Sequence, residues 1–208
     1  KVKSEEKKES NQMAIGEGEF NLPFPKYVRN ELRARPLSPD FGHSEMKYAY
    51  PTDEAALIDD AKVTVLCDIV LGKNETVEMI MSFDISDHSF TSVGAQELAD
   101  RLLPALRGGS MSMFKMFNIS GNAIGDDGLK DILQALKGYE LEELKLRECK
   151  LTIEAAKYLI EAVPTMKRLK TLYLGYNDDE LRTACEKDEK WQELMSKEGL
   201  MIDWTSRF

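Results

Sequence analysis

Histidine is the side chain most often used for acid–base catalysis near neutral pH, and this sequence has two, His43 and His88. His88 stands in the segment "DISDHSF", whose aspartates and serines could complete a Ser-His-Asp relay. Such a relay needs a specific spatial order, which closeness in the sequence does not provide. A turn histidine that hydrogen-bonds the backbone is the simpler interpretation, and we expect no catalytic residue.

Carboxylates and glycines raise two further possibilities, a cation site and a phosphate site. The runs Asp126-Asp127 and Asp178-Asp179-Glu180 lack the ligand spacing of a calcium loop. The segment "GNAIGDDG" lacks the G-K-[ST] ending of a phosphate-binding loop. Acidic residues in the first turn of a helix are explained by the helix dipole. We therefore expect no metal and no cofactor.

Length and charge restrict the class of protein. With 208 residues, 42% of them apolar, one main domain is expected. A net charge of −9 repels phosphate backbones, so no nucleic-acid partner is expected. No apolar run approaches the roughly 20 residues of a spanning helix, which argues against direct membrane insertion. Three widely spaced cysteines, Cys67, Cys149 and Cys185, favour reduced thiols in an intracellular compartment.

An internal repeat sets the elements that position these residues. In "LEELKLRECKL", residues 141–151, leucine fills the first, fourth, sixth and eleventh places, and a cysteine fills the ninth. The same spacing begins again at Ile80, Phe114 and Leu169. The ninth-place residues, which stand 34, 27 and 28 residues apart, are His88, Asn122, Cys149 and Asn177. A period near 28 residues indicates a solenoid.

A helical pattern follows each of the first three copies and keeps the same offsets. Ala95, Leu98, Ala99 and Leu102 lie on one helix face, and shifts of 34 and then 27 residues lead to equivalent apolar sets. The first unit has seven extra residues after that face, so its helix is expected to be about two turns longer.

This pattern resembles the leucine-rich repeat, in its ribonuclease-inhibitor-like subtype, over about residues 76–180. The resemblance implies an α/β fold, a short right-handed solenoid with a curved parallel sheet and outer helices. Strands are expected near 80–86, 114–120, 141–147 and 169–175. The ninth-place Asn or Cys should bond to neighbouring loop backbones, and His88 at that place departs from the family's pattern.

A solenoid has open ends, and we expect helical caps at both. Residues 51–208 form the predicted repeat domain, with an N-terminal cap at 51–75, four repeats at 76–180 and a C-terminal cap at 181–208. The β-branched run Val63-Thr-Val65 leaves a strand in the first cap as an alternative. The C-terminal cap is expected to use Trp191, Leu194, Leu200, Ile202 and Trp204.

Residues 1–50 differ from the repeats, because prolines and aromatic residues are interspersed there and no period of 2 or 3.6 residues persists. The first dozen residues are predicted to be disordered. From Phe20 onward we expect an extended arm that lies either on its own solenoid or on a partner, because a free tail has little reason to expose its rings.

The concave sheet face carries the residues that alternate with the buried ones. This face could be a binding surface, or it could simply be exposed to solvent without binding a partner. The candidate partner-binding residues on the sheet, which we expect to face solvent, are Asp84, Met116, Asn118, Lys145, Arg147 and Tyr173. Those on the arm are Phe24, Tyr27, Phe41 and Tyr48.

These observations favour a non-catalytic scaffold subunit that binds other proteins in a larger intracellular assembly, cytoskeletal or organellar. The alternative is a regulatory binder of a small GTPase or enzyme. In some leucine-rich repeat proteins that stimulate a GTPase, an arginine or another polar group in a strand-to-helix loop participates. The loops "DHSFT", "GNAIGD", "ECKLT" and "YNDDE" contain no arginine. A cytoplasmic or cytoskeletal location is expected, with a mitochondrial one after removal of a targeting segment as the alternative.

Overall fold

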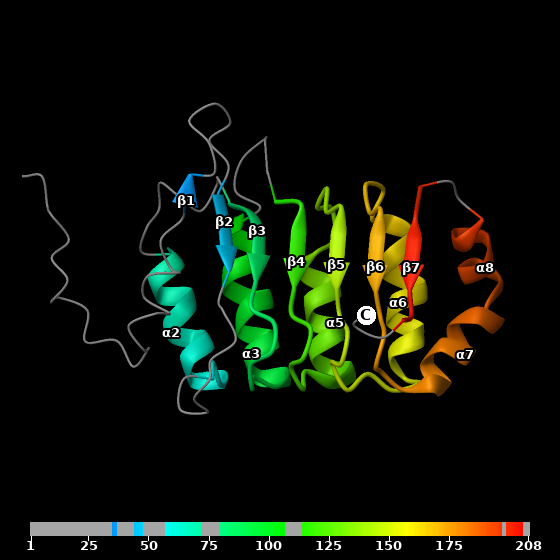
Figure 1. The fold of residues 1–208 in the computed structure, drawn as a ribbon, viewed down its shortest axis with the longest axis horizontal. Helices are drawn as coiled ribbons and strands as arrows, with labels where there is room; N and C mark the ends of the chain where they lie inside the picture. Colours follow the sequence, from blue (N-terminus) through cyan, green and yellow to red (C-terminus); the bar gives the residue numbers. More distant parts are fainter. Residues whose placement is uncertain are drawn as a thin grey trace, which may run out of the picture.

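The structure, a computed structural model, describes residues 35–36, 44–47, 57–71, 80–106, 114–196 and 199–205. Within these ranges one seven-stranded sheet lies in front of a layer of helices (Figure 1). The strands stand side by side in chain order, and every pair from β2 to β7 is parallel. The predicted α/β architecture, a parallel sheet with outer helices, is confirmed.

Each of the four predicted repeat strands is present within its predicted segment. They are β3 (Ile80–Asp84), β4 (Met116–Asn118), β5 (Glu143–Lys145) and β6 (Thr171–Tyr173). In the last three the middle residue is buried and its two neighbours are half-buried, as expected when side chains alternate between the two faces of a sheet.

Helices follow the strands at the repeated offsets. Their bounds are α2 (Asp60–Leu71), α3 (Ser92–Glu97), α5 (Gly125–Ala135), α6 (Ala155–Ala162), α7 (Asp179–Lys187) and α8 (Glu189–Met195). From α3 the chain continues through a π-helical stretch, Leu98–Leu102, into α4 (Leu103–Leu106). This run extends beyond the length of α5, in the direction predicted, and the rest of the extra segment lies outside the described residues. Residues 60–71 are helical, so the alternative strand around Val63 is wrong.

The core lies between the sheet and the helices, where the repeat leucines and phenylalanines meet. Phe83 and Phe117, on neighbouring strands, have ring centroids 6.0 Å apart. All three cysteines are buried in this core without a disulfide. Burial raises the pKa of Cys67 and of Cys185 to about 12, so both thiols are protonated and unreactive while they stay buried.

The ninth-place residues join each unit to the one before it, as predicted. The Asn177 Oδ1 accepts the backbone N–H groups of Cys149 and Leu151, at 2.9 and 3.1 Å. Its Nδ2 donates to the carbonyls of Leu146 and Leu174. Asn122 likewise donates to the Ile85 carbonyl of the preceding unit, at 2.9 Å. In the first unit, the imidazole Nδ1 of His88 accepts the Ile58 N–H at 3.3 Å, which confirms the turn-histidine interpretation.

A left-handed residue occupies the eighth place of every unit, where the chain turns away from the strand. The residues are Asp87 (φ 61°), Gly121 (φ 74°), Glu148 (φ 55°) and Tyr176 (φ 59°). Glycine suits this conformation, but the tyrosine is bulky and more than half exposed there. The turn geometry is therefore imposed by the stacked units rather than by local preference.

At the amino-terminal end the sheet has two strands that the sequence did not predict. β2 (Ser44–Lys47) pairs in parallel with β3, and β1 (Arg35–Pro36) pairs antiparallel with β2. These six residues of the predicted arm therefore lie on the chain's own sheet. The aromatic residues predicted to bind partners from the arm, Phe24, Tyr27, Phe41 and Tyr48, lie outside the described residues.

The carboxyl-terminal cap is not purely helical, and this corrects the prediction. β7 (Met201–Asp203) adds a strand beside β6, which satisfies backbone groups at an edge that would otherwise be open. α8 buries Trp191 and Leu194, and the ring centroids of Trp191 and Trp204 lie 6.4 Å apart. Leu200, Ile202 and Trp204 pack partly against the core.

Candidate functional site

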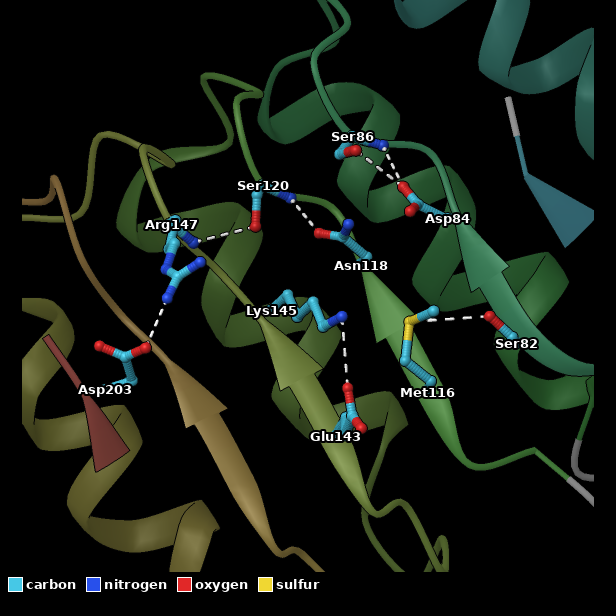
Figure 2. Close-up of polar contacts among 10 residues, drawn as sticks. All are labelled: Ser82, Asp84, Ser86, Met116, Asn118, Ser120, Glu143, Lys145, Arg147 and Asp203. Atoms are coloured by element: carbon cyan, nitrogen blue, oxygen red, sulfur yellow. Dashed lines mark hydrogen bonds and ion pairs between the residues drawn. The ribbon is translucent and has the colours of Figure 1, made fainter. Parts of the chain in front are cut away.

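The candidate site is the open face, defined as the side of strands β3 to β7 that faces away from the helices. Backbone pairing sets its residues in rows across the sheet. One row runs through Asp84, Asn118, Lys145, Tyr173 and Asp203, each paired with the next. Met116 lies in an adjacent row that also contains Ser82 and Glu143. Figure 2 shows most of these side chains, with Arg147, on one face.

The ends of β3 and β4 carry small polar side chains that mostly bond to their own turns. Asp84 is 8% exposed, and its Oδ1 accepts the N–H and the hydroxyl of Ser86 at 3.1 and 2.7 Å. The Asn118 Oδ1 accepts the Ser120 N–H at 3.2 Å. Asp84 therefore offers a partner little surface, whereas Asn118 remains half-buried with its Nδ2 directed away from this turn bond.

The centre of the open face, at β5, is charged and more accessible. Lys145 Nζ lies 3.3 Å from a Glu143 carboxylate oxygen, with side-chain exposures of 29% and 42%. The same ammonium lies 5.4 Å from the centroid of the Tyr173 ring. Both contacts are partly solvated, so they hold the lysine in place only weakly.

Arg147 differs from Lys145, because the carboxyl-terminal cap engages it. Its Nη2 lies 2.5 Å from an Asp203 carboxylate oxygen, and its Cζ lies 4.5 Å from the centroid of the Tyr173 ring. The Arg147 side chain is only 19% exposed, so the expectation that it faces solvent is wrong. Sequence reasoning missed Asp203, because no periodic signal marks β7. We call Arg147, Tyr173 and Asp203 the carboxyl-terminal clamp.

The pKa of Asp203 reflects this contact. Burial acts to raise the pKa, but hydrogen bonds from Thr205 and the positive charge of Arg147 outweigh it, and the pKa lies below its ordinary value. The carboxylate is therefore ionised near neutral pH, as an ion pair with Arg147 requires.

The chain after β7 crosses the open face at Gly175. A Cβ placed on Gly175 would lie 1.9 Å from the carbonyl oxygen of Thr205. Only glycine leaves room for this crossing, so the carboxyl-terminal segment covers the end of β6. The part of the open face that this segment leaves uncovered is centred on β4 and β5.

We expect Gly175→Ala to lower the free energy of unfolding by about 1–3 kcal/mol, because the added methyl forces Thr205 and the clamp to shift. Urea titration measures the change. As a control, the same substitution in a chain that ends at Asp203 should cost about 0.5 kcal/mol or less. Equal costs in the two backgrounds would contradict the crossing at Gly175.

Within the described part of the chain, no group of three or more His, Cys, Asp and Glu side chains is arranged to hold a metal ion. No helix among the same residues is long and apolar enough to cross a membrane.

Comparison with known proteins relates the repeats to one family. A family model described as "Leucine Rich repeat" matches residues 112–133, the segment that contains β4 and most of α5. Human "NACHT, LRR and PYD domains-containing protein 13" is 30% identical over 131 residues, which make up 61% of this chain and 12% of that protein. The chain thus spans a small part of this relative, and the likeness carries no information on the rest of it.

Proposed function

We propose, from the premise that this chain is a leucine-rich repeat protein of the ribonuclease-inhibitor-like type, that it is a protein-binding module. Its finer role in this proposal is that of a non-catalytic scaffold subunit in a larger intracellular assembly, cytoplasmic or cytoskeletal, with a mitochondrial location as the alternative. Three buried thiols without a disulfide are compatible with a reducing compartment.

The observation that carries the proposal is the accessible centre of the open face. Met116, Asn118, Glu143, Lys145 and Tyr173 are each half-buried on neighbouring strands, where the helices do not cover them. Methionine and tyrosine are enriched at the centres of protein interfaces, and charged neighbours add specificity. Arg147 supports this surface from within the clamp instead of contacting the partner directly.

The arm supplies the second contact in this proposal. We retain 1–50 as the arm and 51–208 as the repeat domain, with β1 and β2 anchoring the arm to the sheet edge. The aromatic residues Phe24, Tyr27, Phe41 and Tyr48 would then bind the same partner as the open face.

The test compares proteins that co-purify with tagged variants. Replacing Asn118 by Arg and Lys145 by Glu together should reduce partner recovery at least tenfold, about 1.4 kcal/mol of binding free energy, because both side chains lie in the accessible row. Quantitative mass spectrometry measures recovery, and thermal melting checks that the variant is folded.

Lys157→Glu is the matched control, because Lys157 on α6 is exposed on the helical side and its ionic and ring contacts among the described residues are with the nearby Glu154 and Tyr158. It should leave recovery unchanged. If the double variant retains every partner that the control retains, the open face is not the binding surface, and the helices become the candidates.

A regulatory binder of a small GTPase or other enzyme remains the alternative, and it would use the same face. The two roles differ in one measurable property. A regulator changes the catalytic rate of its purified partner when it is added, whereas a scaffold subunit leaves that rate unchanged and stays bound.

A further inference from the structure

Among the four ninth-place residues, His88 is the histidine. It contacts the amino-terminal cap, which we define as residues 57–71. In a later unit, the Asn177 amide oxygen accepts backbone N–H groups of the preceding unit. His88 does the same for the Ile58 N–H through Nδ1. An amide oxygen accepts a hydrogen bond at any ordinary pH, but an imidazole nitrogen accepts only while it is unprotonated.

Polar contacts dock the cap at two places in the described part of the chain: around Ile58, and at an ion pair between Asp68 of α2 and Arg101 of the π-helical stretch. The Ser89 N–H donates to the Ile58 carbonyl at 3.1 Å. The Asp60 carboxylate accepts the Thr91 N–H, the Thr91 hydroxyl and the Gly94 N–H, at 2.7, 2.8 and 2.8 Å. The Ile58 side chain is fully buried beside them. A disturbance at His88 therefore acts at one of the two places where the cap is attached.

We propose that His88 makes the docking of the amino-terminal cap dependent on pH. Protonation at Nδ1 replaces the acceptor with an N–H group that points at the N–H of Ile58. The hydrogen bond is lost and two donors oppose each other. Because His88 is only 6% exposed, water cannot readily replace the lost contact.

The charged groups on the elements around His88 set how strongly the proton is favoured. Among the described residues they include Asp84 and Asp87 in its own loop, Asp59, Asp60, Lys62 and Asp68 in the cap, and Glu97 and Arg101 in the helical run that packs on the cap. The carboxylates favour an imidazolium, whereas burial opposes it. Several are already engaged: Asp60 by three donors, Asp84 by Ser86, Asp59 by Lys62, and Asp68 and Glu97 by Arg101.

The direction of the effect follows from proton linkage. The docked cap needs the neutral ring, so the open state binds one proton more. Docking is therefore strongest where the ring is neutral, and it weakens as the pH falls through the range in which an exposed imidazole takes up a proton. One proton limits the change to about tenfold per pH unit.

Cys67 in α2 provides the readout. Its side chain is fully buried, and its thiol lies 3.9 Å from the Glu97 carbonyl oxygen of α3. It can react only when the cap opens. Cys149 and Cys185 are buried in later units and serve as internal controls.

The experiment labels the full chain between pH 8 and pH 5 with 4,4′-dithiodipyridine, a disulfide reagent that also works in acid. Peptide mass spectrometry then gives the labelling rate of each cysteine. Below about pH 6.5 the ratio of the Cys67 rate to the Cys185 rate should rise in the wild type by up to about tenfold per pH unit. In His88→Asn the ratio should not change with pH, because an amide does not titrate in this range. Asparagine suits the position, since the chain itself uses it at Asn122 and Asn177.

Equal pH courses in the wild type and His88→Asn would overturn the proposal. So would a wild-type Cys67 that stays as protected as Cys185 at pH 5. If Cys67 is already labelled at pH 8 in His88→Asn, His88→Gln replaces it as the non-titrating variant. If that variant also fails to dock the cap, the wild-type ratio across pH decides alone.

Discussion

Replacing Leu146 by alanine is expected to lower the free energy of unfolding by about 2–5 kcal/mol. Leu146 follows β5 directly and has no exposed surface, so the substitution removes buried methyl groups and leaves a cavity between the sheet and the helices. Its backbone N–H donates to the Tyr173 carbonyl at 2.9 Å, and the substitution leaves this bond in place. The loss therefore measures side-chain packing alone.

The neighbouring substitution Lys145→Ala is the control, and it should cost about 0.5 kcal/mol or less. The two residues are adjacent in sequence but point to opposite faces of the sheet. Urea titration of both variants measures the difference. Similar losses would mean that the buried and open faces of the strand are wrongly assigned.

Asn177→Ala is expected to lower the free energy of unfolding by about 2–4 kcal/mol. The side chain satisfies four backbone groups: the N–H groups of Cys149 and Leu151 and the carbonyls of Leu146 and Leu174. Alanine removes all four bonds at once. Because Asn177 is half-buried, water recovers part of the loss, which keeps the expected cost below the sum of four buried groups.

Asn118→Ala is the matched control, because its side-chain oxygen accepts one bond, from the Ser120 N–H, on the open face. It should cost about 1 kcal/mol or less. Thermal or urea unfolding compares the two asparagines directly. Equal costs would mean that the position of an asparagine in the repeat has no influence on stability. The inter-unit role of Asn177 would then be wrong.

The repeat strands and helices could be predicted because stacking repeats the same burial pattern at nearly constant offsets. The additional strands could not. β1, β2 and β7 are two to four residues long and gain their place from backbone pairing with an existing edge. Such pairing requires no alternation of side chains, so a segment such as Met201–Asp203 carries no signal of its own.

The open face was predicted from the alternation of side chains along a strand, and the structure places its six predicted residues together. Their environments were harder to predict. Arg147 meets Asp203, which is 56 residues away in the sequence, because a strand that had not been predicted brings it there. The Asp84 carboxylate accepts a hydrogen bond from the Ser86 hydroxyl, and this local bond leaves the carboxylate less free to bind a partner.

The sheet pairs strands only with their neighbours in the chain, and the helices pack chiefly in the same succession. The described part of the molecule is consequently a linear series of interfaces, each between neighbouring units. An end unit can open by breaking one interface, whereas an interior unit must break two. Thermal fluctuations therefore enter from the two ends and reach β4 and β5 last, so the surface that remains ordered longest is the middle of the sheet.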